Sequence, residues 1–265
     1  MPKEASGDWS PALYERFAKE RERPFRDLLA LVEPRPQMRV IDLGCGTGKA
    51  TQILADTVGA PSVMAVDSSE AMLAEARKLA DPRLSLVRAD IADHVRALPA
   101  GSVDLVFSNA ALQFLPDHPA LLAAIARALA PGGQIAIQVP RNVEHPSYQV
   151  ANELSAEAPY ADPLAGYRHG SFVLTARAYG EALWNLGFRR QNVAARIYVH
   201  EADSPEAALA WAKGGLMNAY RERLSAPLFA RFADDYRERL LARLPARGPF
   251  PFTYERIVLW AQGPD

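Results

Sequence analysis

Two acidic residues and a run of alternating glycines are the residues best suited to chemistry in this sequence. Asp42 closes a short apolar run that begins at Met38, and Gly44, Gly46 and Gly48 follow it at alternate positions. Glycine lets the backbone turn sharply and approach a ligand closely, and a helix that begins after such a turn directs its first N–H groups at the same space. The segment therefore predicts a strand, a tight turn and a helix that present bare backbone to a ligand.

The spacing of these glycines distinguishes between nucleotide ligands. It is G-x-G-x-G rather than the G-x-G-x-x-G of dinucleotide-binding proteins, and Asp42 stands two residues before the first glycine. A carboxylate there can accept a hydrogen bond from an ammonium group, which suits the amino-acid end of S-adenosylmethionine (SAM) better than a pyrophosphate. Asp67 ends the next strand-like run, at the offset of roughly 20 residues at which an acid binds ribose hydroxyls. Together these residues indicate a SAM site.

Composition and charge disfavour several classes of protein. The chain has 265 residues, 49% of them hydrophobic, and a formal net charge of −1. This length suits one domain with an insertion, and the near-zero charge disfavours a nucleic-acid or anionic-membrane partner. No apolar run reaches the roughly 20 residues of a membrane helix, and the N-terminus lacks the apolar region of a signal peptide, so we expect a cytoplasmic protein.

The single cysteine and the histidines do not form a pattern that indicates catalysis or metal binding. Cys45 cannot form an internal disulfide, and we interpret it as a small residue of the glycine turn rather than a nucleophile. The five histidines are scattered without the spacing of metal ligands, so we expect no metal site.

The elements that must position the acids and glycines alternate between strand and helix as far as Pro140. Apolar periodicity predicts helices at 50–58, 70–79 and 121–129 and strands at 38–43, 63–66, 84–88, 104–108 and 135–139. This alternation is typical of a doubly wound, mostly parallel α/β sheet, in which ligands bind outside the carboxyl ends of the strands. The loop from Asn109 to Gln113 follows one of these strands, and we expect it beside the reacting group.

The segments that flank this region break the alternation. Residues 8–32 predict two short helices separated near Pro24, whose many charges either form a solvated face or close the site. Beyond Pro140 the pattern predicts a helix with an irregular excursion at 141–170, a helix at 174–186, a strand at 192–200, helices at 204–244 and a last strand at 254–261. We expect the helices of 141–170 and 204–245 to roof the active site.

Four segments resemble the successive motifs of class I SAM-dependent methyltransferases: VIDLGCGTG, MAVDSSEAMLAEAR, VRADI and VDLVFSNAALQFLPDH. The resemblance implies a doubly wound, mostly parallel seven-stranded Rossmann-like sheet with a helical cap and an antiparallel last strand. It also implies SAM as cofactor, with S-adenosylhomocysteine (SAH) as product. The implied domains are an N-terminal helical segment that closes the site (1–36), a SAM-binding core (37–140), and cap insertions with the last two strands (141–265).

The same resemblance implies a set of cofactor-binding residues. Asp90 is expected to accept a hydrogen bond from the adenine amino group, with Ile91 packed on the ring. Asp90 could instead serve only as a strand-end cap, and Met72 only as a core residue. The full implied set is Tyr14, Arg23, Asp42, Gly44, Cys45, Gly46, Asp67, Ser68, Met72, Asp90, Ile91, Asn109 and Ala110.

A narrower resemblance concerns the substrate. The opening DWSPALYERFAKERERPFRDLLALV, the segment NAALQFLPDH and the closing ERIVLWA are similar to the trans-aconitate 2-methyltransferase family. This implies esterification of a small carboxylic acid, which needs no general base because a carboxylate is ionised at neutral pH. No residue is assigned a catalytic role with certainty; Asn109 and Gln113 are expected to position the reactants. The implied substrate-binding residues are Trp9, Arg21, Gln113, Arg141, Arg168, Tyr220 and Arg221.

Two positions depart from the pattern of that family and leave the acceptor open. Where the family has G-L-R-P, this chain has Met217 in place of the arginine, and where it has M-P-D-N, this chain has Arg141 in place of the aspartate. Either Arg141 or Arg221 supplies the cation, or the acceptor is another, less charged acid or natural product. The remaining alternatives are a SAM-binding protein without turnover and a methyltransferase of protein or nucleic acid. The near-neutral charge favours a small-molecule acid, and we expect a monomer.

Overall fold

A computed structural model describes residues 18–170, 172–213 and 216–263, without the side chains of 18–21 and 211–213. The strands are β1 (Val40–Leu43), β2 (Val63–Asp67), β3 (Leu84–Arg88), β4 (Val103–Asn109), β5 (Leu129–Pro140), β6 (Arg190–Ala202) and β7 (Phe250–Gln262). They form one sheet in the order β3-β2-β1-β4-β5-β7-β6. The pairs from β3 to β5 are parallel, and β7 is antiparallel to β5. The predicted doubly wound sheet with an antiparallel last strand is confirmed.

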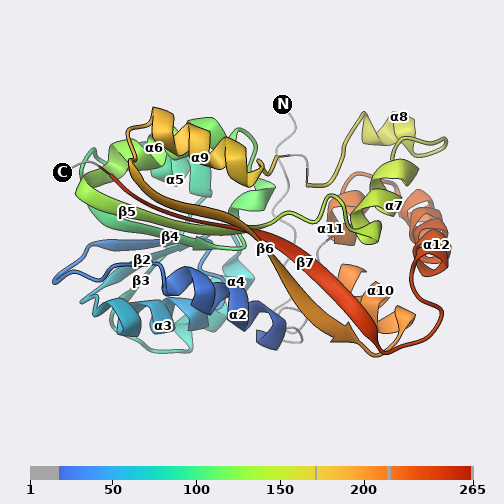
Figure 1. Ribbon diagram of the computed structural model, residues 1–265, viewed down its shortest axis with the longest axis horizontal. Helices are drawn as coiled ribbons and strands as arrows, with labels where there is room; N and C mark the ends of the chain where they lie inside the picture. Colours follow the sequence, from blue (N-terminus) through green and yellow to red (C-terminus); the bar gives the residue numbers. More distant parts are fainter. Residues whose placement is uncertain (1–17, 171, 214–215, 264–265) are drawn as a thin grey trace. The chain divides into compact units, whose positions relative to one another are not determined.

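Helices cover both faces of this sheet (Figure 1). On one side lie α2 (Ala18–Leu29), α3 (Lys49–Val58) and α4 (Glu70–Arg77), and on the other α5 (Ile91–Ala97), α6 (His118–Ala128) and α9 (Ala176–Asn185). Successive strand residues point to opposite faces, so Leu105 and Phe107 of β4 pack in the core that contains α2 and α3, whereas Val106 packs in the core that contains α5, α6 and α9. Because apolar residues occupy both faces, most residues of the central strands are buried.

Helix α2 is continuous through Pro24, and the prediction of two helices separated there is wrong for the described part. A proline inside a helix removes one backbone hydrogen bond. Here the buried Phe25, Leu28 and Leu29 hold the helix against the sheet. An ion pair between Arg26 and Glu22 also spans the proline. Tertiary packing therefore overrides the local signal of proline.

The chain divides into two compact units. Of the described residues, the sheet unit contains 18–140, 172–196 and 256–263, and the helical unit contains 141–170 and 197–255. The helical unit comprises α7 (Pro146–Leu154), α8 (Ala161–Leu164), α10 (Pro205–Lys213), α11 (Leu216–Arg221), α12 (Ala226–Arg243) and parts of β6 and β7. Its helices share an aromatic core formed by Tyr160, Tyr220, Phe232 and Tyr236.

Candidate cofactor site

A pocket of the sheet unit lies where the carboxyl ends of β1, β2, β3 and β4 meet. Its lining residues are Gly44, Gly46, Asp67, Ser68, Met72, Asp90, Ile91, Asn109, Ala110, Ala111, Phe114 and Leu115. The sequence predicts all of these except Ala111, Phe114 and Leu115 as cofactor-binding residues. They come from four separate strand ends, so parallel topology alone brings them together. Of the three additional residues, Ala111 lies in the loop from Asn109 to Gln113 that the sequence predicts beside the site, and Phe114 and Leu115 lie just beyond it.

Asp67 is held at the end of β2 by backbone donors from both sides. Its Oδ2 accepts from the Gly46 N–H at 2.9 Å and its Oδ1 from the Ser69 N–H at 2.8 Å. A carboxylate oxygen has two lone pairs, so each oxygen retains acceptor capacity for a ligand hydroxyl. This geometry suits the predicted contact with a ribose.

The first two glycines of the loop meet different constraints. Gly44 has φ +81°, and a Cβ placed on it would lie 2.1 Å from the Cβ of Ala111, so only glycine fits against the loop after β4. Gly46 has φ +55°, but a Cβ there would meet no atom within 4 Å. The bare backbone of Gly46 therefore faces open space in the pocket, as a loop that approaches a ligand requires.

Asp90 and Ser69 cap the two helices that begin at the pocket. Asp90 Oδ1 accepts from the Asp93 N–H at 2.9 Å and begins α5, a helix that the sequence analysis did not predict. Ser69 Oγ accepts from the Met72 N–H at 3.4 Å and begins α4. Asp90 thus caps α5, a role that the sequence analysis did not foresee, and it also lines the pocket, where its expected contact with the adenine amino group stays a prediction.

The loop after β4 is held by hydrogen bonds to its backbone. Ala110 has φ +57°, in the left-handed region, and its N–H donates to the Gln138 carbonyl at 2.8 Å. Its carbonyl accepts from Gln113 Nε2 at 2.9 Å. Gln113 therefore holds the loop that carries Ala110, but it is not among the residues that line the pocket.

A buried histidine anchors the short helix η1 (Leu112–Phe114) of the same loop. His118 Nε2 lies 3.0 Å from the Leu112 carbonyl, and its Nδ1 lies against the hydroxyl of Tyr179 in α9. A carbonyl only accepts, so Nε2 carries the proton and Tyr179 donates to Nδ1. Burial lowers the pKa of His118, which keeps the ring neutral.

Asp42 and Cys45 lie behind the loop rather than on the pocket surface. Asp42 is 3% exposed and accepts from Thr51 Oγ1 at 2.6 Å, and burial raises its pKa to about 7. Cys45 is buried, and burial followed by the nearby Asp42 and Asp67 carboxylates raises the pKa of its thiol. A protonated, buried thiol is a poor nucleophile, which fits a small packing residue in the turn.

The proposed substrate residues of the helical unit have varied surroundings. Arg141 donates to Glu255 Oε1 at 3.1 Å, and Tyr220 is buried with its hydroxyl donating to Asn152. Arg221 has its guanidinium carbon 5.3 Å from the centre of the Phe229 ring. Arg168 is exposed and lines a hollow of this unit with His169. Their role in substrate binding stays a prediction.

The N-terminal candidates fall at the limit of the described chain. Trp9 and Tyr14 lie outside the described residues, and the side chain of Arg21 is not described. Arg23 lies in α2 with an exposed side chain. Their contacts with cofactor or substrate also stay predictions.

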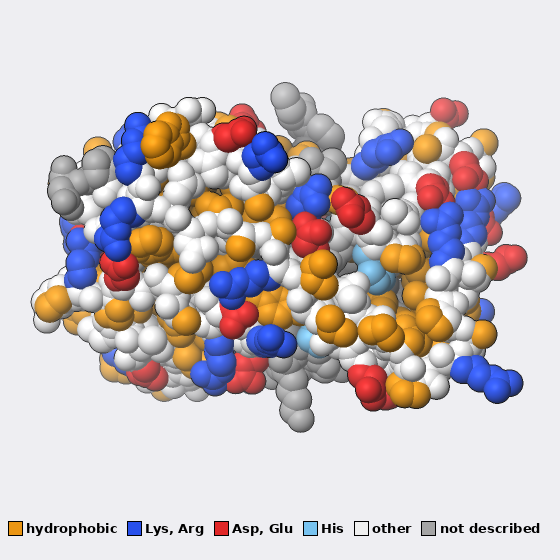
Figure 2. All heavy atoms as spheres, viewed as in Figure 1, with side chains coloured by type: hydrophobic (Ala, Val, Ile, Leu, Met, Phe, Trp, Pro, Cys, Tyr) orange, Lys and Arg blue, Asp and Glu red, His pale blue; other side chains and the backbone are white. Residues whose placement is uncertain are grey.

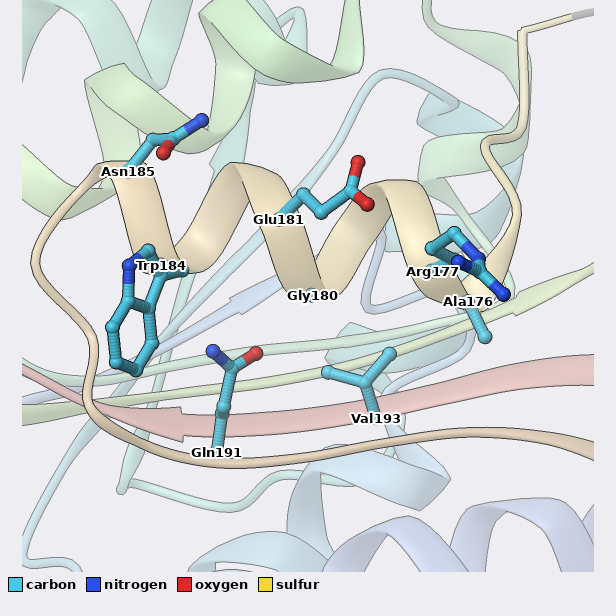
Figure 3. Close-up of a pocket in the computed structure, with 8 residues that line it drawn as sticks. All are labelled: Ala176, Arg177, Gly180, Glu181, Trp184, Asn185, Gln191 and Val193. Atoms are coloured by element: carbon cyan, nitrogen blue, oxygen red, sulfur yellow. The ribbon is translucent and has the colours of Figure 1, made fainter.

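A larger hollow of the sheet unit, between α9 and β6, has a different character (Figure 3). Gln191 and Val193 of β6 point toward the helix, which contributes Arg177, Glu181 and Trp184. It contains none of the predicted cofactor residues. In the described ranges, no group of three His, Cys, Asp or Glu side chains is arranged to hold a metal ion, and no helix is long and apolar enough to cross a membrane.

Comparison with known proteins identifies the family. A family model described as a methyltransferase domain matches residues 40–133. The chain is 38% identical over 261 residues to the trans-aconitate 2-methyltransferase of Deinococcus radiodurans, which covers 97% of this chain and 99% of that protein. It is 40% identical over 252 residues to the Streptomyces avermitilis protein of the same name, covering 92% and 93%. The chain belongs to the trans-aconitate 2-methyltransferase family. As a member of this family it is a SAM-dependent methyltransferase.

Solved structures share the fold of this family member at low sequence identity. The YcgJ protein of Bacillus subtilis superposes with a TM-score of 0.61 and 13% identity, covering 92% of this chain and 99% of that one. Haemonchus contortus phosphoethanolamine N-methyltransferase 2, solved in complex with SAM, gives a TM-score of 0.53 and 18% identity, covering 92% of this chain and 53% of that one. These likenesses show the fold alone.

The pocket fits the cofactor of the family. Asp67 offers acceptors for ribose hydroxyls, Asp90 for an exocyclic amine, and Ile91 an apolar surface for a ring. The open space at Gly46 admits a ligand against the backbone. Behind the glycine loop lies Asp42, whose pKa of about 7 lets it ionise when a cation binds nearby. These residues would hold SAM; the moiety that each contacts stays a proposal.

Proposed function

We propose that this chain transfers the methyl group of SAM to a carboxylate of trans-aconitate and forms a methyl ester. The observation that carries the proposal is near full-length similarity to proteins of that name, together with a pocket that gathers the predicted cofactor residues at four strand ends. We propose a free small molecule as the acceptor, since the formal net charge of −1 gives no basic field for a nucleic acid.

The chemistry asks the protein mainly for positioning. SAM supplies an electrophilic methyl carbon on a sulfonium, and an oxygen of the acceptor carboxylate forms the new bond to it as the bond to sulfur breaks. An ionised carboxylate brings its own lone pair, so no proton has to be removed. The protein can lower the barrier by aligning the reactants and excluding water, which is worth several kcal/mol.

The acidic side chains of the pocket support an acceptor that needs no base. Both oxygens of Asp67 accept backbone N–H groups, and Asp90 Oδ1 accepts the N–H of Asp93. The neutral His118 has both ring nitrogens engaged by Leu112 and Tyr179. These groups suit ligand binding and loop support better than proton abstraction.

A different small acid is the second candidate because of Met217. This residue replaces the arginine of the family pattern and is 2% exposed, within the apolar core of the helical unit. It supplies no charge, so any compensating cation must come from another residue. Without such a cation, an acceptor with fewer negative charges would bind better.

Turnover of labelled SAM with a panel of acids tests the proposal. The panel contains trans-aconitate, cis-aconitate, isocitrate and a monocarboxylic fatty acid. We expect ester formation on trans-aconitate in clear preference to the others. Turnover of another acid with none on trans-aconitate would retain the reaction class but refute the substrate. If no acid is methylated, the proposed function is wrong.

A further inference from the structure

A residue of the neighbouring strand holds the carboxamide of Asn109. Gln138 of β5 lies opposite Asn109 of β4 in the parallel pairing, and it is 2% exposed. Gln138 Nε2 donates to Asn109 Oδ1 at 3.1 Å, and the Gln138 carbonyl accepts from the Ala110 N–H at 2.8 Å. Gln138 therefore fixes both the side chain that ends β4 and the first peptide of the loop.

This contact decides which end of the Asn109 carboxamide is available to the pocket. Asn109 is a lining residue, and the oxygen and nitrogen of a carboxamide diverge from one carbon atom. With the oxygen engaged by Gln138, the nitrogen and its two hydrogens remain for a ligand. The loop thereby offers a hydrogen-bond donor.

The surroundings of Gln138 disfavour the opposite orientation. Gln138 Oε1 is buried without a hydrogen-bond partner among the described residues. If both carboxamides were flipped, Gln138 Oε1 would accept from the Asn109 nitrogen. Gln138 Nε2, with its two hydrogens, would then lie where no hydrogen-bond partner is present among the described residues. Buried N–H groups without an acceptor are rarer than under-satisfied carbonyl oxygens. The observed orientation is thus the less costly one.

We propose that Gln138 is a positioning residue that holds Asn109 with its amide nitrogen toward the pocket, where it donates to the acceptor carboxylate. An ionised carboxylate only accepts hydrogen bonds, so it binds an N–H group and is repelled by a carbonyl oxygen. The inference rests on the proposed function, since a donor is the useful group only if the acceptor is an anion.

Two substitutions of Gln138 test the orientation. Gln138→Glu keeps the size of the side chain but, when ionised, only accepts, so Asn109 must turn its nitrogen to it and its oxygen to the pocket. Gln138→Leu removes the contact and leaves both orientations accessible. We expect the KM for trans-aconitate to rise about tenfold with Glu, the loss typical of one hydrogen bond to a charged group, and less with Leu. The turnover rate at a saturating concentration of acceptor should change much less, and so should the affinity for SAH.

The order of the two effects separates positioning from structural damage. A purely structural glutamine predicts that Leu, which loses every side-chain hydrogen bond, is worse than the nearly isosteric Glu. Repeating both substitutions in an Asn109→Ala background separates orientation from simple charge. The difference between Glu and Leu should vanish there, whereas direct repulsion by a new carboxylate would persist.

A second buried glutamine of β5 is the matched control. Gln134 is 1% exposed, accepts from Trp260 Nε1 at 2.8 Å and bonds the backbone of Glu33. Gln134→Leu disturbs the same strand without touching Asn109, so we expect the acceptor KM to stay at its wild-type value.

The outcomes distinguish this inference from the proposed function. The wild type is measured first, on the acid of the panel that it methylates best. If KM is unchanged in both variants, if Leu is worse than Glu, or if the difference survives Asn109→Ala, the inference is overturned and the methyltransferase function stands. If the wild type methylates no acid, the function fails and the inference fails with it.

Discussion

The carboxylates around the glycine loop differ in their hydrogen-bonding environment, and the difference suggests different tasks. Asp67 accepts two backbone N–H groups and Asp90 accepts one, and both line the pocket, where their oxygens can also accept from hydroxyl or amino groups. Asp42 is buried and accepts from the Thr51 hydroxyl, and burial raises its pKa to about 7. Because this pKa lies near neutral pH, we expect the charge of Asp42 to respond to a cation that binds in front of it.

The stability of the cofactor-free protein should depend on pH through Asp42. Its pKa is about 7 in the folded chain against an ordinary 3.8, so the folded state holds a proton that the unfolded state has released. This contribution is fully present below about pH 4 and is lost as the pH rises through about 7, with a size of up to roughly 4 kcal/mol. We expect the free energy of unfolding in urea, measured as wild type minus Asp42→Asn, to fall across this window.

Binding of SAH should make the fall in this free energy of unfolding with pH smaller, because the ammonium group of SAH favours the ionised form of the Asp42 carboxylate. Asn can still accept from Thr51, so the variant removes the titration with little change in packing. Identical pH profiles of wild type and Asp42→Asn, with and without SAH, would contradict the assigned titration.

At this scale the sequence predicts contacts that are local and misses those that depend on strand register. Asp67 and the glycines could be identified because their spacing follows from one strand-turn-helix unit. The contact of Gln138 with Asn109 joins residues 29 apart, and it depends on how β5 aligns with β4. No local pattern encodes that alignment, so Gln138 could be found only in the structure.

At the scale of elements, His118 connects α6 to the loop that lines the pocket and to α9. Leu112 and Tyr179 lie on either side of its ring, and all of these groups are buried. Phe114 and Leu115 lie two and three residues after Leu112 in the chain, and both line the pocket. The position of this part of the pocket wall thus depends on how three helical elements are joined through one imidazole.

Replacement of His118 should therefore weaken cofactor binding as well as stability. His118→Phe fills a similar space but removes the hydrogen bonds to the Leu112 carbonyl, which keeps the N–H of Leu115, and to the Tyr179 hydroxyl, which costs about 2 kcal/mol of stability. Calorimetry should show SAH affinity about tenfold weaker, equivalent to ~1.4 kcal/mol.

The control is Tyr179→Phe, which removes only the hydroxyl and retains the bond to Leu112. We expect it to lower the melting temperature with little effect on SAH affinity. Equal SAH affinity in wild type and His118→Phe would show that the loop keeps its place without the histidine.

Elements were predictable where periodicity and packing agree. The strands β2 and β3 and the helices α3 and α4 lie close to the predicted ranges because one apolar face or run decides them. The sequence misses α5, whose signal is mainly the capping of Asp90, and the continuation of α2 through Pro24, which depends on burial of Phe25 against the sheet. In both cases the decisive interaction is a cap or a tertiary contact rather than a repeat.

At the scale of the whole molecule, positive and negative charges nearly balance. The formal net charge is −1, and Figure 2 shows Lys and Arg side chains interspersed with Asp and Glu over the face in view. Several of these charges are paired across the surface, as Arg239 is with Glu157 and Arg243 with Glu153. Such a surface has little long-range field for an anionic substrate.

The rate of substrate capture should therefore depend weakly on salt. We expect kcat/KM for trans-aconitate to change less than about threefold between about 0.05 and 0.3 M ionic strength. Salt shortens the Debye length, but a surface without a strong field offers little for the salt to screen. Initial rates at low acceptor concentration measure this directly. A steep decline would instead reveal a concentrated basic surface that steers the trianion.

The position of β7 between β5 and β6 has a consequence for how the protein is made. The ribosome completes β5 and β6 before it reaches β7, which begins at Phe250 and is the strand that joins them. In the interval β5 has no neighbour on that side, and β6 has no place in the sheet. The nascent chain must therefore keep an apolar strand edge out of contact with other chains, which makes synthesis the stage most exposed to aggregation.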